Sequence, residues 1–303
     1  MKQRAYLFMT LSSFFWGVSF ILTKSIFDSE PHMGVFTILT FRLMLASMVM
    51  VPLLLATKKL ERIARRDIKW FLLIALAEPF TYYIFETYGL RHVSASLASI
   101  VVALIPLFIP FGMRLVYSEK IPSSTLTGIV LSCVGIGIML SGNTDWSGEL
   151  PGITLLNGAI VTAIAYTVLL VRVVNRYRPT TVTAYQNLLG FLYYLPVMLI
   201  TEGDNLPRIN YTPQLIGTLL ALGIFCSTVA YTFYNYGIHH LGASSASIFN
   251  NIIPIFSLIA AVAIGQEEFA WEKAVGIVVA IGGVVIAQLK AGKQQEAGHT
   301  HNQ

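Results

Sequence analysis

The chain has 303 residues, of which 55% are hydrophobic and only 12% are charged, and its mean hydropathy is +0.68. Because soluble domains carry about 25% charged residues, this composition excludes an ordinary soluble fold and indicates an integral membrane protein. The net charge of +5 does not indicate nucleic-acid binding, since the basic residues lie beside apolar segments.

Apolar runs long enough to cross ~30 Å of hydrocarbon as helices recur along the chain. We expect an all-α integral membrane protein with ten transmembrane helices, at about 5–23, 34–56, 69–90, 94–114, 122–141, 151–171, 183–201, 213–237, 243–264 and 272–289. The first run is not followed by a small-residue cleavage site and predicts an uncleaved span rather than a signal peptide. Residues 290–303 are expected to form a polar, disordered, cytoplasmic tail.

Basic residues in the links between spans predict the orientation, because cytoplasmic loops are enriched in Lys and Arg. The link after the second span, KKLERIARRDIK, and the link after the sixth, with Arg172, Arg176 and Arg178, are rich in them. The links GNTDWSGELPG and TEGDNLPRIN hold one Arg between them. We therefore expect a multi-pass protein of the cell (inner) membrane with both termini in the cytoplasm.

An internal repeat organises the chain. YGLRHVSASLASIVVALIP at 88–106 returns as YGIHHLGASSASIFNNIIP at 236–254, identical at ten of nineteen positions with a constant offset of 148 residues. Residues 5–141 and 151–289 then form two repeats of five spans each. Because five is odd, the second repeat enters the membrane inverted, an arrangement that is typical of secondary transporters with alternating access.

The sequence resembles the EamA-type members of the drug/metabolite transporter superfamily. The resemblance is carried by FFWGVSFILTKS in the first span, TFRLMLAS in the second, TAYQNLLGFLYYLPV in the seventh, and the repeated segment continued to Glu119 and Glu267. It implies two five-helix halves and transport of amino acids, other small metabolites or toxic compounds, often outward. The first half departs from the second in running four residues longer between Pro31 and Arg42 than between Pro179 and Gln186.

Charged residues inside the spans are candidates for the transport site, because each costs about 2.5–3.5 kcal/mol to insert at mid-bilayer. Arg42 and Glu78 reach a similar depth from opposite faces, about 12 and 14 Å at 1.5 Å per residue, so an ion pair between them is one hypothesis. Glu78, Tyr82 and Glu86 are spaced i, i+4, i+8 and share one helix face, with Tyr83 beside it. Glu78 is the candidate for proton coupling, and a tight pair with Arg42 would favour a gate or an anchor instead.

The eighth span carries a matching polar and aromatic stripe of Tyr231, Tyr234 and Asn235. Two such stripes facing each other predict a central cavity for a solute with polar and apolar parts. Trp16 lies in mid-span and fits either the cavity wall or the core. Lys24, at the end of the first span, is expected to snorkel toward water.

The second copy of the repeat replaces Val102 and Ala103 with Asn250 and Asn251. Amides are costly in lipid, so the two asparagines either line the cavity or bond neighbouring helices. Pro106 and Pro254 are repeat-equivalent, and we expect them to bend their spans in pairs and to act as hinges.

The sequence therefore predicts a secondary transporter or exporter of small organic metabolites, amino-acid-like ones foremost, working by alternating access. A passive facilitator, a channel-like permease and a membrane-embedded enzyme are the alternatives. No P-loop or H-E-x-x-H motif is present, and we expect no catalytic residue, metal or cofactor. The expected partners are a small-molecule substrate and the lipid bilayer; proton coupling and a homodimer are left open.

Overall fold

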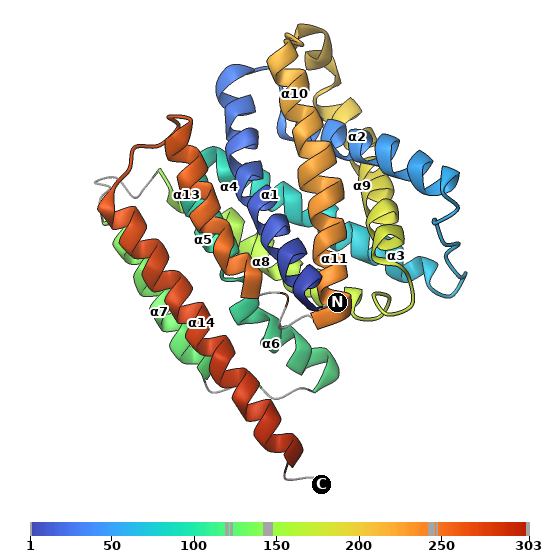
Figure 1. Cartoon of the computed structure of the whole chain (residues 1–303). Helices are drawn as coiled ribbons and strands as arrows, with labels where there is room; N and C mark the ends of the chain where they lie inside the picture. Colours follow the sequence, from blue (N-terminus) through green and yellow to red (C-terminus); the bar gives the residue numbers. More distant parts are fainter. Residues whose placement is uncertain are drawn as a thin grey trace.

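The computed structural model describes residues 2–118, 121, 124–141, 148–241, 246 and 248–300, and all regular elements in this part are helical. Long helices cross one another in a single bundle, with α7 and α14 packed side by side along one edge (Figure 1). The helices are α1 (Lys2–Ser29), α2 (Val35–Ala56), α3 (Ile68–Ala75), a π-helical turn (Leu76–Thr81), α4 (Tyr82–His92), α5 (Ala95–Val102), α6 (Ile105–Tyr117), α7 (Ser124–Leu140), α8 (Leu150–Leu170), α9 (Pro179–Thr201), a 3-10 turn (Gly203–Arg208), α10 (Pro213–Ala221), a second π-helical turn (Leu222–Val229), α11 (Ala230–Leu241), a 3-10 turn (Ile248–Ile252), α13 (Ile253–Ala263) and α14 (Trp271–Thr300).

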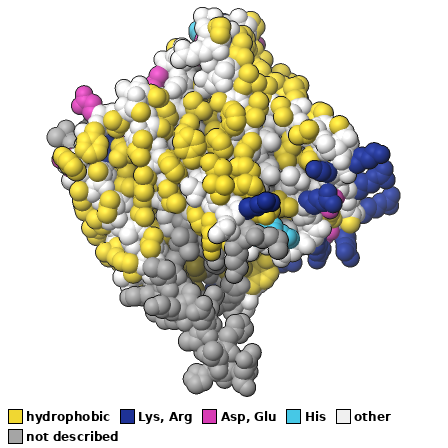
Figure 2. All heavy atoms as spheres, in the orientation of Figure 1, with side chains coloured by type: hydrophobic (Ala, Val, Ile, Leu, Met, Phe, Trp, Pro, Cys, Tyr) yellow, Lys and Arg dark blue, Asp and Glu magenta, His cyan; other side chains and the backbone are white. Residues whose placement is uncertain are grey.

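The outer surface confirms that the chain is a membrane protein. Six helical stretches are long and apolar enough to span a bilayer: Gln3–Ser29, Val35–Ala56, Ile68–His92, Ala95–Tyr117, Leu150–Leu170 and Pro213–Leu241. Leu126–Met139 and Phe249–Ala263 are shorter apolar helices. Hydrophobic side chains cover most of the visible face, and basic side chains gather at one edge (Figure 2). The exact count of ten spans stays a prediction.

Helix α14 extends to Thr300, and the disordered character of the tail stays a prediction. Residues 301–303 lie outside the described part of the chain.

The third predicted span is broken at its centre. Glu78 has extended backbone angles (φ −149°, ψ 123°) between α3 and α4, so carbonyl groups near the break lose their helical partners. Side chains of α9 replace those partners. Gln186 Nε2 donates to the Glu78 carbonyl (3.5 Å), and the Tyr194 hydroxyl donates to the Pro79 carbonyl (3.0 Å). Irregular backbone is tolerated at membrane depth only where protein satisfies it in this way.

In both repeated segments the regular α-helix is interrupted just before the expected prolines, and the bends themselves stay a prediction. The fourth span is interrupted between Val102 and Ile105, and a 3-10 turn (Ile248–Ile252) precedes Ile253 in the ninth. Pro106 and Pro254 each lie in the first turn of the helix that follows. A proline there removes no helical hydrogen bond, because the first amides have no intrahelical acceptor. The hinge role of the two prolines stays a prediction.

Helix α2 begins against the end of α9. The Glu202 carboxylate, which directly follows α9, accepts hydrogen bonds from the backbone amides of Phe36 (3.1 Å) and Thr37 (2.7 Å). A carboxylate at a helix N-terminus satisfies free amides and interacts favourably with the helix dipole. The carboxylate approaches so closely that a Cβ on Gly34 would lie 2.1 Å from it.

The opposite ends of α2 and α9 make the reciprocal contact. Glu61, in the link after α2, accepts a hydrogen bond from the backbone amide of Arg178 (2.6 Å), and its own amide donates to Thr181 Oγ1 (3.3 Å). Each helix is therefore capped by an acid that follows the other, and the two helices run antiparallel.

Helices α7 and α14 pack through glycines. A Cβ on Gly135 would lie 2.5 Å from the amide nitrogen of Ala280 and 2.6 Å from the carbonyl oxygen of Gly276. Close approach of backbones at small residues is the usual way in which membrane helices associate.

Gly135→Ala is expected to destabilise the protein by about 1–3 kcal/mol, because the new methyl group overpacks this helix contact. Gly137→Ala is the matched control on the same helix, since nothing lies within 4 Å of a Cβ there. Thermal unfolding in detergent, followed by intrinsic fluorescence, measures both. Equal midpoints for the two variants would contradict the proposed packing role of Gly135.

Candidate functional site

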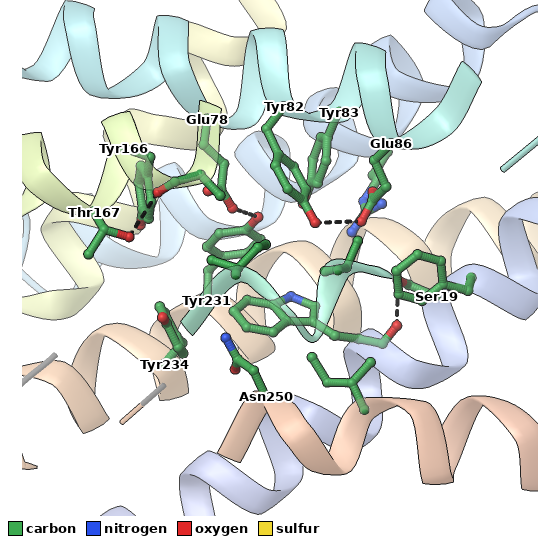
Figure 3. A pocket seen from close by; sticks show the side chains of 17 residues that line it. Ser19, Glu78, Tyr82, Tyr83, Glu86, Tyr166, Thr167, Tyr231, Tyr234 and Asn250 are labelled. Atoms are coloured by element: carbon green, nitrogen blue, oxygen red, sulfur yellow. Dashed lines mark hydrogen bonds between the residues drawn. The ribbon is translucent and has the colours of Figure 1, made fainter. Parts of the chain in front are cut away.

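A cavity lies at the centre of the bundle (Figure 3). It is narrow, with about 50 Å³ open to the centre of a water-sized sphere, which is room for a few water molecules. Its lining residues are Trp16, Ser19, Phe20, Arg42, Glu78, Tyr82, Tyr83, Glu86, Val102, Ile105, Ala163, Tyr166, Thr167, Tyr231, Tyr234, Asn250 and Ile253. A metabolite larger than a few waters requires this space to widen.

Two carboxylates enter the cavity from the broken third span, and each accepts a hydrogen bond from a tyrosine. The Tyr231 hydroxyl donates to Glu78 (2.5 Å), and the Tyr82 hydroxyl donates to Glu86 (2.9 Å) (Figure 3). Tyr82 and Glu86 share one face of α4, as their spacing predicts. Glu78 reaches the same cavity from the extended residue before α4, not from a continuous helix.

Arg42 supplies the positive charge. Its side chain is 3% exposed, donates from Nε to Ser227 Oγ (2.6 Å) and lies over the Tyr83 ring at 4.4 Å. A cation over an aromatic face is an attractive arrangement. The hypothesis of an Arg42–Glu78 ion pair is wrong for this structure, because each group has other partners and no ion pair joins them in the described residues.

Aromatic rings form the remaining walls. Trp16 packs against Tyr231 and Tyr234 with ring centroids 5.0 and 4.9 Å apart, and its Nε1 donates to the carbonyl of Cys226 (3.2 Å). Trp16 thus belongs both to the cavity wall and to the packing of α1 on the second half.

Several buried polar atoms of the lining have no hydrogen-bond partner among the described residues. They are the hydroxyls of Tyr83 and Tyr166 and Oδ1 of Asn250. Buried polar atoms without a partner are rare in proteins. At the wall of a cavity they are available to a bound molecule.

Two of the candidate residues do not line the cavity. Asn235 is fully buried and donates to Thr183 Oγ1 (2.9 Å), so it bonds neighbouring helices. Asn251 is also buried and is not among the lining residues. Asn250, in contrast, reaches the cavity.

Eight lining residues were missed by the sequence analysis: Ser19, Phe20, Val102, Ile105, Ala163, Tyr166, Thr167 and Ile253. The offset of 148 residues leads from the candidate Asn250 to Val102, because several lining positions occur in repeat-equivalent pairs. These pairs are Ser19 with Thr167, Tyr83 with Tyr231, Glu86 with Tyr234, Val102 with Asn250, and Ile105 with Ile253. Both repeats therefore contribute equivalent positions to one cavity, and they differ in the chemistry of two of the pairs.

In the described part of the chain, no three His, Cys, Asp or Glu side chains are grouped so that they could hold a metal ion. Glu119, the expected counterpart of Glu267, lies outside the described residues.

Comparison with known proteins gives consistent matches over nearly the whole chain. An uncharacterized transporter of Archaeoglobus fulgidus is 25% identical over 96% of this chain and 99% of its own, and the uncharacterized transporter YcxC of Bacillus subtilis is 28% identical over 96% and 94%. An S-adenosylmethionine/S-adenosylhomocysteine transporter of Chlamydia muridarum is 23% identical over 84% and 82%. A crystal structure superposes with a TM-score of 0.69 at 19% identity, over 95% of this chain and 98% of that one, which shows a shared fold.

The sequence model of the EamA-like transporter family matches residues 3–141 and again residues 150–288. The chain therefore belongs to the EamA-like transporter family and, with it, to the drug/metabolite transporter superfamily.

Proposed function

We propose that the protein is a secondary transporter that carries small zwitterionic or cationic organic metabolites, amino-acid-like ones foremost, outward across the cell membrane. The observation that carries this proposal is the central cavity, which holds one guanidinium and two carboxylates between aromatic walls. Ionisable groups facing a cavity at membrane depth mark substrate or ion pathways.

The charges favour a particular kind of solute. Arg42 uses Nε for Ser227 and has no carboxylate partner among the described residues, so its terminal nitrogens can receive a solute carboxylate. Glu78 and Glu86 can receive an ammonium group. With all three groups ionised the cavity carries one net negative charge, which favours zwitterions and cations over anions.

Aromatic rings suit the apolar part of such a solute and can also hold a cationic group by cation–π attraction. The transporter from Chlamydia muridarum is named for S-adenosylmethionine and S-adenosylhomocysteine, both of which carry an α-amino acid group. At 23% identity this relative supports the amino-acid-like class, not the same substrate.

Alternating access is part of the proposal. The antiparallel course of α2 and α9 supports repeats of opposite orientation, and the repeat-equivalent lining pairs support a cavity between these repeats. Two similar halves around one site can adopt two similar states that open to opposite sides.

A ligand that binds the folded protein raises its unfolding temperature. In a thermal-shift screen of purified protein we expect free amino acids to stabilise it, and N-acetylated amino acid esters, which lack both charges, to have no effect. Asn250→Ala is expected to reduce the shift by removing a cavity acceptor. Asn157→Ala is the matched control, because Asn157 is exposed and donates to the Ile153 carbonyl within α8. A shift that is equal for charged and blocked ligands would contradict the zwitterion class.

Glu78→Gln is expected to abolish the dependence of flux on a pH gradient in proteoliposomes, because the amide cannot take up and release a proton. The control is Glu272→Gln, an exposed acid at the start of α14. Unchanged gradient dependence in the Glu78 variant would remove this residue from proton coupling. Wild-type flux that ignores the gradient altogether would identify a passive facilitator.

A further inference from the structure

The break between α4 and α5 is bound by two charged side chains from elsewhere in the chain. Lys24 Nζ, from α1, donates to the carbonyls of Leu90 (3.1 Å) and Val93 (2.9 Å) at the end of α4. The Glu267 carboxylate, from the α13–α14 link, accepts from the backbone amide of Ser96 (3.0 Å) at the start of α5. A cation thus meets the negative end of one helix, and an anion meets the positive end of the next.

Both charges are held in place. Glu267 is bridged to Lys273 (2.7 Å). The neighbouring Gln266 donates from Nε2 to Ser25 Oγ (2.7 Å), which ties the α13–α14 link to α1. Lys24 is half-buried and bonded to backbone carbonyls, so the expectation that it snorkels into water is wrong.

These contacts lie directly beyond one end of the central cavity. Lys24 follows the lining residue Phe20 by four positions, and Leu90 follows Glu86 by four, so each contact residue is ~6 Å along the same helix face. The contacts lie between the cavity and the end of the bundle at which α1 ends, called here the Ser29 end.

The Lys24 contact joins two groups of helices, and the Glu267 contact lies at α5, which packs on both α13 and α8. Helix α1 packs on α11 and α13, whereas α4 and α6 pack on α8. If the Lys24 and Glu267 contacts broke, the two groups of helices could separate at the Ser29 end. Glu202 and Glu61 would still join α2 to α9 at both ends of these helices.

The second repeat contains residues equivalent to those of the Lys24 contact, at the opposite end of the bundle. The residue equivalent to Lys24 is Arg172, after α8, and the carbonyls equivalent to those of Leu90 and Val93 belong to Ile238 and Leu241, at the end of α11. In this structure Arg172 lies over the rings of Trp70 (4.6 Å) and Tyr117 (5.7 Å). Trp70 and Tyr117 belong to α3 and α6, so Arg172 contacts helices on its own side of the cavity.

We propose that Lys24 and Arg172 are alternating gate residues. Lys24 closes the Ser29 end in the state observed here, and Arg172 closes the opposite end, on the carbonyls of α11, when Lys24 is released. This inference rests on the proposed transport function and assigns a role to two basic residues outside the cavity.

Accessibility of the cavity tests the proposal without a substrate. In a protein with Cys133 and Cys226 replaced by alanine, Ser19→Cys places one thiol in the cavity wall. A membrane-impermeant methanethiosulfonate is applied to the face at which Ser29 lies. Lys24→Met is expected to raise the labelling rate roughly ten-fold, through loss of charge-assisted hydrogen bonds. Arg172→Met is expected to lower the rate below that of the parent, because it destabilises the state open at the Ser29 end.

Lys24→Arg, which keeps the donors, and Arg62→Met, which removes an exposed basic residue in the link after α2, are expected to label like the parent. Glu267→Gln repeats the test independently of Lys24 and is expected to raise the rate. An unchanged rate in both Lys24→Met and Glu267→Gln, or equal increases for Lys24→Met and Arg172→Met, would overturn the gate. Such a labelling result would overturn the gate but not the proposed transport function. Absence of wild-type flux for every amino-acid-like solute would refute the proposed function, and the labelling rates would still report on access to the cavity.

Discussion

Backbone amides and carbonyls at helix breaks need hydrogen-bond partners, because hydrocarbon offers none. This bundle contains several breaks, at Glu78, between α4 and α5, and at the starts of α2 and α9. Each is served by a side chain from a distant part of the chain. The side chains that meet these needs also determine where helices can pack and where the central cavity lies.

Function follows from where the irregular backbone is placed. The extended residue Glu78 interrupts the third span beside the cavity, and the unwinding turns its carboxylate toward Tyr231 on α11. Tyr194 and Gln186, on α9, satisfy carbonyls of the break from behind. The break therefore carries a charged group of the site.

The sequence predicted the class of fold, the repeat and most of the cavity wall, because each depends on hydropathy or on spacing. The sequence could not predict which side chains contact each other. Arg42 and Glu78 reach the same depth, yet the ring of Tyr83 and the hydroxyl of Ser227 hold the guanidinium, while Tyr231 holds the carboxylate. The sequence predicted that Lys24 extends toward water. Lys24 instead binds carbonyls that are free because α4 ends there. Side-chain partners of this kind depend on three-dimensional packing.

The reciprocal caps on α2 and α9 have a consequence for biogenesis. Synthesis proceeds from the N-terminus, so Glu61 has already been made when the start of α9 is synthesised. The first amides of α2 are made before Glu202, their hydrogen-bond acceptor. The first half can enter the bilayer early, but the start of α2 completes its hydrogen bonds only after the ribosome has translated α9. The two halves thus complete each other's secondary structure, and neither is a finished unit when it leaves the translocon alone.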